Sequence, residues 1–273
     1  MSHRPMLKFR GLLASSMLLG ACVSTPGRGV PGHYALDSLS NGCLRNPAYC
    51  ATLTGKETTT VQAVGTAVAS GAAVLAVLDK TLEEHIQEEL VDCANLARSE
   101  VLIRHRAQFV DPTPSDAECR QWTTDAQGRR VTWAMRLGSE MHEVALQCAQ
   151  GKLNGLRPGG FSLEPCYRHD LRTGQTTFIS CEQVEELLAN GCSSELKGTI
   201  RPDVVIHTGN PLQALAVFDF KFPCVNKDGD KSSEWREYPE GHPCHGLMNQ
   251  GQLYKKALGP EPVRVAPRWG ILR

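Results

Sequence analysis

The stretches RPDVVI at residues 201–206 and VFDFKF at residues 217–222 decide the fold of this chain. Fifteen residues separate the aspartate of the first stretch, Asp203, from that of the second, Asp219. Polar and apolar side chains alternate in the second stretch, and a β-strand sends successive side chains to opposite faces. A strand here buries its phenylalanines on one face and presents Asp219 and Lys221 on the other.

The residues between the two stretches predict a hairpin. TGNP at residues 208–211 supplies turn-forming residues. A hairpin that turns near Pro211 sets Asp203 across from Asp219, and Lys221 then joins the two carboxylates. Such a cluster is a compact site for a hard divalent cation and a water molecule. The alternative is an ordinary amphipathic hairpin with surface charges, because D-x-K on its own is a common sequence.

Together, P-D followed by D-x-K resembles the PD-(D/E)XK phosphodiesterase superfamily, the restriction-endonuclease fold. The resemblance implies an acidic residue on a preceding helix. Residues 133–148 show helical periodicity, and Glu140 borders their apolar stripe, with Glu143 as second choice. The resemblance also matches the Q-x-x-x-Y element of exonuclease-like members, because Gln250 and Tyr254 lie four apart on a predicted helix over 247–258. For all of these residues the alternative is a solvated helix position.

The resemblance implies an α/β (α+β) fold over residues 130–273, a restriction-endonuclease-like core in which helices flank a mixed sheet, preceded by a helical region. Its first strand is expected at 161–167 or 176–179, its last within 263–272, and a further helix near 182–188. The implied activity is metal-dependent phosphodiester hydrolysis. Asp203, Asp219 and Glu140 would hold Mg²⁺, or Mn²⁺ in its place. Lys221 would orient the attacking water, and Gln250 and Tyr254 would position the nucleic-acid strand.

The N-terminus reads as a lipoprotein signal over residues 1–21. A basic start precedes a short apolar run that ends in LGAC at residues 19–22, which resembles the bacterial lipobox. By that resemblance Cys22 is acylated and anchors the protein in the outer membrane. An ordinary secretory signal is the alternative. Residues 22–60 are rich in Gly, Pro, Ser and Thr and predict a flexible tether.

A helical region is predicted over residues 61–110. Residues 61–78 carry no charge, and they predict either a membrane-active helix or a buried alanine-rich one. Asp79 opens an amphipathic helix whose apolar residues recur at helical spacing.

Cysteine usage agrees with export. The chain has 11 cysteines, and ten remain once Cys22 is set aside. An even number in an exported chain predicts disulfides. We expect one of them to join Cys224 to Cys244 and close the loop between them. The alternative is a metal site of Cys224 with HPCH at residues 242–245.

The charge balance limits the function. The chain has 29 basic and 29 acidic residues, whereas a protein that coats nucleic acid without specificity would be basic. The combination of lipobox and nuclease motif resembles the swarm-inhibition lipoprotein toxins of myxobacteria, a kind of polymorphic toxin. That resemblance implies a nuclease, with DNA the commoner substrate, that acts in the cytoplasm of a recipient cell and is neutralised by a cognate immunity protein. The alternatives are an envelope-structural or adhesion lipoprotein and a periplasmic hydrolase of cell wall or lipid.

Overall fold

The computed structural model describes residues 77–191, 193–196, 198–225, 234–238, 240, 242 and 244–273. The predicted signal, Cys22, the tether and residues 61–76 of the apolar segment lie outside the described residues. Of the helices in the described part, none has the length and apolar character needed to cross a membrane.

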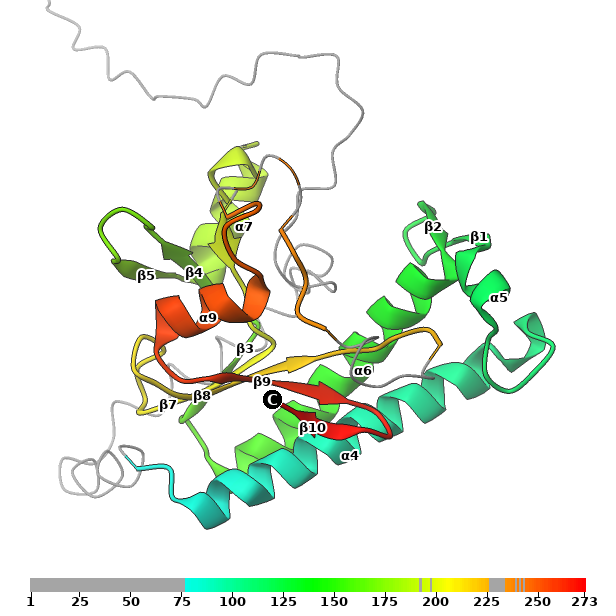
Figure 1. Cartoon of the computed structure of the whole chain (residues 1–273), viewed down its shortest axis with the longest axis horizontal. Coiled ribbons are helices and arrows are strands. Elements are labelled where there is room, and N and C mark those ends of the chain that lie inside the picture. Colours follow the sequence, from blue (N-terminus) through cyan, green and yellow to red (C-terminus); the bar gives the residue numbers. More distant parts are fainter. Residues whose placement is uncertain are drawn as a thin grey trace, which may run out of the picture.

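The described elements follow one another as shown in Figure 1. The helices are α4 (Lys80–Arg104), α5 (Asp116–Arg120), α6 (Trp133–Leu156), α7 (Cys181–Ala189) and α9 (Gln250–Leu258), with short 3₁₀ turns at Arg106–Gln108 and Ser193–Leu196. The strands are β1 (Trp122–Thr124), β2 (Arg130–Thr132), β3 (Phe161–Leu163), β4 (Cys166–His169), β5 (Thr176–Ile179), β6 (Thr199–Ile200), β7 (Val204–His207), β8 (Ala214–Phe220), β9 (Pro262–Ala266) and β10 (Gly270–Leu272).

The main sheet has five strands in the order β10-β9-β8-β7-β3. β3, β7 and β8 are antiparallel neighbours, and β9 runs parallel to β8. A parallel neighbour needs a crossover connection, and α9 lies in the connection between β8 and β9. The predicted mixed α+β architecture is confirmed.

The predicted hairpin is present, with the predicted register. Val204 pairs with Phe218, so Asp203 and Asp219 are the next residues along the two strands and lie opposite each other. Phe218, Phe220 and Phe222 are buried in one hydrophobic cluster, as the alternation predicts.

Two layers of helices cover the main sheet (Figure 1). The phenylalanine face packs on α6 and α4, which lie side by side, and α9 packs on the opposite face against Val205 and Val217. Asp79 caps α4 by accepting a hydrogen bond from the Leu82 amide, and the apolar stripe of α4 joins the same core as the sheet. The described part of the 61–110 region therefore shares one core with residues 130–273.

A second, smaller sheet has the order β5-β4-β6 and packs on α7. The two candidates for the first strand thus belong to different sheets, since residues 161–163 join the main sheet and residues 176–179 the small one. Glu164 follows β3 with a backbone φ of 46°, a left-handed conformation that redirects the chain toward β4. Helix α7 confirms the helix predicted near 182–188.

The predicted disulfide between Cys224 and Cys244 is wrong. Cys224 is bonded to Cys119, with their Cα atoms 6.1 Å apart, because the chain continues beyond β8 toward α5. Cys244 lies instead in the cluster under α9. A second disulfide, Cys93–Cys148, joins α4 to α6. The alternative use of Cys224 as a metal ligand is also excluded by its disulfide.

Candidate metal and phosphate site

Three of the sequence-predicted residues meet where β8 ends. Lys221 Nζ lies 2.6 Å from Asp219 Oδ2, and Asp203 Oδ2 accepts a hydrogen bond of 2.6 Å from the Phe220 amide. Asp203, Asp219 and Lys221 are all buried. The opposed positions of the two aspartates in the hairpin bring the carboxylates together, and the alternation of β8 places Lys221 beside them.

Helix α9 completes this group with Gln250 and Tyr254. Lys221 donates to Gln250 Oε1 at 2.7 Å, Gln250 Nε2 donates to the Tyr254 hydroxyl at 2.9 Å, and Tyr254 donates to Asp219 Oδ1 at 3.2 Å. The helix starts at Gln250 rather than Leu247, because Asn249 caps it. Gln250 and Tyr254 therefore point inward and hold the lysine and the aspartate in place.

A histidine that the sequence analysis did not select reaches the same site from α6. His142 Nε2 lies 2.8 Å from Asp203 Oδ1, and its side chain is 2% exposed. Burial would lower the pKa of His142, but the Asp203 carboxylate outweighs burial and raises it. The edge of the imidazole packs against Phe220 and Phe222, which fixes the ring between the sheet and the helix.

A third carboxylate, Glu164, lies on the other side of Asp203. One ligand atom each from His142, Glu164 and Asp203 lies within 4.8 Å of the others. Glu164 is paired with buried Arg201 at 3.6 Å, and the Arg201 Nε atom donates to the Glu164 carbonyl. The pairing fixes the direction of the Glu164 side chain, whose backbone already lies in a constrained conformation.

The site holds three buried carboxylates, Asp203, Asp219 and Glu164, each paired with a basic group: His142, Lys221 and Arg201 respectively. Burial raises the pKa of Asp219 to about 6, the Asp203 carboxylate adds to that effect, and Lys221 opposes it. Two carboxylates that share one dry site repel each other. The arrangement is therefore one that a divalent cation would stabilise.

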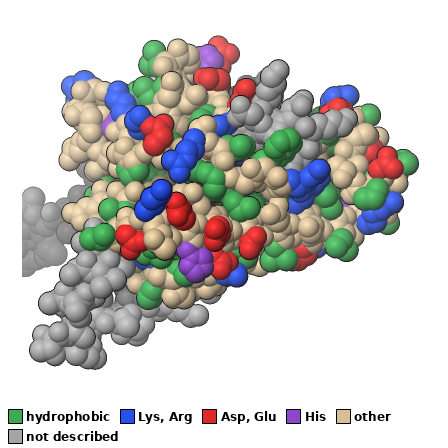
Figure 2. Space-filling view, turned by 60° about the horizontal axis from the view of Figure 1, so that its bottom comes forward, with side chains coloured by type: hydrophobic (Ala, Val, Ile, Leu, Met, Phe, Trp, Pro, Cys, Tyr) green, Lys and Arg blue, Asp and Glu red, His purple; other side chains and the backbone are tan. Residues whose placement is uncertain are grey.

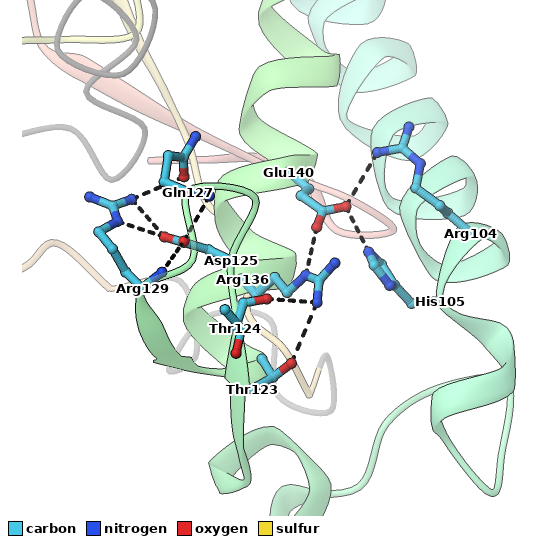
Figure 3. Close-up of polar contacts among 9 residues, drawn as sticks. All are labelled: Arg104, His105, Thr123, Thr124, Asp125, Gln127, Arg129, Arg136 and Glu140. Carbon is cyan, nitrogen blue, oxygen red and sulfur yellow. Dashed lines mark hydrogen bonds and ion pairs between the residues drawn. The ribbon is translucent and has the colours of Figure 1, made fainter.

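Glu140, the predicted helix ligand, lies elsewhere. Its carboxylate contacts Arg104 at 3.2 Å, His105 at 2.7 Å and Arg136 at 2.9 Å (Figure 3). Partial burial would raise the pKa of Glu140, but the hydrogen bonds from His105 and Arg136 outweigh it and lower the pKa. The structure thus does not bring Glu140 together with Asp203 and Asp219. Glu143 is exposed.

Trp235 covers the lysine. Its ring centroid lies 4.9 Å from Lys221 Nζ and 5.9 Å from the ring of Tyr254. Gly251 permits this position, because a Cβ atom there would come within 2.6 Å of the indole. Arg264, paired in register with Asp219 on the parallel neighbour β9, lies 6.0 Å from the same ring.

The residues that sequence reasoning missed had signals of different strength. His142 falls in the row Gly138, His142, Ala145 and Ala149, whose small residues mark the closely packed face of α6. Glu164 lies within the strand candidate at residues 161–167, where it is the acidic residue. Arg264 had a weaker signal, as the polar residue between two valines of the last strand. Trp235 had none beyond its place in the long loop after Cys224.

No family model, no curated protein and no solved structure matches this chain.

Proposed function

We propose that this protein hydrolyses phosphodiester bonds of nucleic acid, with a divalent metal ion held at Asp203. The observation that carries the proposal is the convergence of Asp203, Asp219 and Lys221 with Gln250 and Tyr254 in one buried network. These parts follow one another along the chain in the order that the PD-(D/E)XK resemblance implies, from helix and first strand through hairpin and second helix to last strand.

The residues present fit a metal ion. His142, Glu164 and Asp203 offer a nitrogen and two carboxylates within 4.8 Å of one another, and Asp219 adds a carboxylate whose pKa is raised by burial and by Asp203. The carboxylate oxygens suit Mg²⁺ or Mn²⁺, whereas an imidazole ligand is more typical of zinc and the later transition metals. A bound ion would polarise the phosphate and acidify a water molecule. In this proposal His142 and Glu164 are the additional metal ligands, a role that the sequence had predicted for Glu140.

The protein's own residues would position the reactants. Lys221 is fixed by Asp219 and Gln250, so its ammonium is preorganised to hold a water molecule and to stabilise charge that develops on the phosphate. Tyr254 donates to Asp219 and keeps that carboxylate turned toward the site. Gln250 and Tyr254 thus support Lys221 and Asp219, in addition to the contact with the strand expected of them.

Access requires movement of Trp235. The charged groups of the site are at most 8% exposed, and the indole lies over the lysine. A phosphodiester reaches Lys221 only if the indole leaves it. The cation–π contact is worth about 0.5–2 kcal/mol, an amount that the binding of a polyanion readily offsets.

The decisive experiment is plasmid cleavage by the full chain in Mg²⁺, Mn²⁺ and EDTA, with wild type and Asp219→Ala compared. We expect cleavage by the wild type only, and only with metal. The matched control is Asp125→Ala, since Asp125 lies in the turn between β1 and β2 (Figure 3) and contacts Arg129. Equal cleavage by wild type and Asp219→Ala would overturn the assignment.

We further propose that the protein acts as a lipid-anchored toxin, delivered to the cytoplasm of a recipient cell and matched by an immunity protein. Support comes from the lipobox-like residues 19–22 ahead of a nuclease-like site. Expression in the cytosol without residues 1–21 should be toxic, and Asp219→Ala should remove the toxicity. Toxicity only after export would favour a cell-wall or lipid hydrolase, and none at all an envelope-structural or adhesion role.

A further inference from the structure

Arg98 is a buried charge without the usual compensation. It lies on the inner side of α4 and is 6% exposed. Its Nη1 atom is fully buried and has no hydrogen-bond partner among the residues that the structure describes. A buried guanidinium without a partner is costly. Arg98 Nη1 therefore keeps a donor that an anionic ligand could accept.

A second arginine lies next to it. The turn between β9 and β10 is tied to α4 by a hydrogen bond of 2.7 Å from the Arg268 amide to Asn95 Oδ1. Asn95 and Arg98 are three residues apart, hence on the same side of the helix. Burial lowers the pKa of Arg98, and the positive charge of Arg268 lowers it further. The guanidinium groups of Arg98 and Arg268 thus lie near each other, and the positive charge of Arg268 disfavours the charged form of Arg98.

The backbone at Arg268 adds a second cost. Its φ is 68°, a left-handed conformation that favours glycine or asparagine and strains other residues. The side chain is exposed, so packing does not explain an arginine there. The following residue, Trp269, is 45% exposed. The turn therefore presents a cation and an aromatic ring to solvent beside the buried cation.

We infer that Arg98 and Arg268 form a binding site for a phosphate group, and that this phosphate belongs to the nucleic-acid strand that is cleaved at Lys221. This inference rests on the proposed function. An anion between the two guanidiniums would receive the unused donors of Arg98 and would relieve the repulsion between the charges.

Lys221 and the arginine pair both lie near the C-terminal ends of β8 and β9. β8 and β9 are parallel, with Asp219 beside Arg264, so the C-terminal ends of the two strands lie next to each other. Arg268 follows Arg264 by four residues. Strand geometry limits that separation to about 13 Å, the axial rise of about four nucleotides. Lys221 lies on the α9 face of the sheet and the arginine pair on the α4 face, so a strand that contacts both would cross the ends of β8 and β9 between them.

The charge on the α4 side favours a strand over a membrane. Figure 2 shows acidic side chains gathered on the face that α4 borders, interspersed with apolar and basic ones. An anionic membrane surface would lie flat against that face and meet those acids. Arg264 and Lys221 are buried beside the Trp235 ring, so in this proposal a strand at the arginine pair reaches them only after that ring moves.

The test measures binding in EDTA, where no cleavage occurs. A labelled oligonucleotide, single-stranded or duplex, is titrated at several salt concentrations with wild type, Arg98→Met and Arg268→Gly. Arg172→Met is the matched control, since Arg172 is exposed in the turn after β4. We expect about tenfold weaker binding and a salt slope smaller by about 1 for each of the two variants. The control should bind like the wild type.

Melting of the same proteins in inorganic phosphate, against chloride at equal ionic strength, supplies the second measurement. Phosphate should stabilise the wild type and the control but not Arg98→Met. Without phosphate, Arg98→Met and Arg268→Gly should melt no lower than the wild type, because one loses a buried charge and the other a strained backbone. Lower melting of both without phosphate, and no response of the wild type to it, would mean a structural role and overturn the site.

Three other outcomes are decisive. If phosphate binding depends on Arg98 but oligonucleotide binding does not, the ligand is a free phosphate and the assignment to the strand is overturned. Arg98-dependent binding to phosphatidylglycerol vesicles, without an effect on oligonucleotides, would overturn it in favour of a lipid headgroup. If oligonucleotide binding behaves as expected but the plasmid stays intact in Mg²⁺ and Mn²⁺, the phosphate site stands and the proposed hydrolysis fails.

Discussion

His142 and Glu140 lie two residues apart on α6, and their surroundings differ in almost every respect. Glu140 is 21% exposed and contacts Arg104, Arg136 and His105 on the outer side of the helix (Figure 3). His142 is buried between the helix and the sheet and contacts Asp203. A helix turns by about 100° per residue, so the two side chains point to opposite sides. A shift of two positions on one helix thus separates a surface ion cluster from a candidate metal ligand.

This comparison shows what kind of charge each environment supports. The Glu140 group has its charges offset by direct partners and by water, and such groups contribute little net free energy. The group around His142 has three buried carboxylates, and Lys221 and Arg201 are paired with two of them. In the proposed function, only the second group takes part in the chemistry.

The largest effect is expected from Asp219→Asn. Loss of this carboxylate should reduce plasmid cleavage by about 10³-fold or more. In metal-free buffer the unfolding free energy should rise, because burial and Asp203 raise the pKa of Asp219 and so disfavour its charged form at neutral pH. Cleavage assays and urea denaturation of the same preparations check both. Loss of activity together with loss of stability would mean that Asp219 is structural.

Separate substitution of His142 and of Glu140 by glutamine tests the comparison directly. His142→Gln should lower cleavage by about 100-fold, the loss typical of an altered metal site, and should raise the metal concentration needed for half-maximal activity. Glu140→Gln should cleave within about threefold of the wild type, since surface ion pairs seldom affect a distant reaction. A larger loss in Glu140→Gln than in His142→Gln would restore Glu140 as the helix ligand.

His207 differs from His142 in its ring contacts. It is also buried, but the contacts of its ring are with a backbone amide and a hydroxyl rather than with a carboxylate. Its Nδ1 accepts from the Gly209 amide, and Ser162 Oγ lies 3.0 Å from its Nε2. Burial lowers the pKa of His207 to about 4. The unfolded chain then binds more protons than the folded one between pH 4 and the ordinary value of 6.5, so stability is lost as the pH falls through that window. The loss should approach about 3 kcal/mol at pH 4. Urea denaturation of wild type and His207→Gln from pH 7.5 to 4.5 would detect it, and parallel profiles would contradict it.

The smallest effect is expected from Glu140→Gln on stability. Removal of its charge weakens contacts with Arg104, His105 and Arg136 at a side chain that is 21% exposed. We expect a loss of about 1 kcal/mol in unfolding free energy, reduced at high salt. Arg129→Gln, which weakens the exposed pair with Asp125, is the comparison variant. A change beyond about 3 kcal/mol would place the Glu140 group among buried networks.

The hairpin and its site were predictable because short-range rules determine them. Strand alternation fixed the face of Lys221, and the turn residues fixed the register of Asp203 against Asp219. The sequence did not predict that His142 rather than Glu140 contacts Asp203, because the motif demands an acid and was weighed above the phase of the apolar stripe, which points to His142. The Cys119–Cys224 disulfide and the position of Trp235 depend on where distant segments pack, and neither leaves a periodic signal. The acylation of Cys22 and the membrane-active or buried helix at residues 61–76 remain predictions, because both lie outside the described residues.

The parallel pairing of β8 with β9 has a consequence for synthesis. A ribosome releases Asp203, Asp219 and Lys221 well before Gln250, Tyr254 and Arg264, and β8 stays an edge strand until β9 arrives. No nascent chain that stops short of Arg264 holds all of these residues. A chain that is exported while unfolded would therefore leave its cell of origin before the centre has been assembled there.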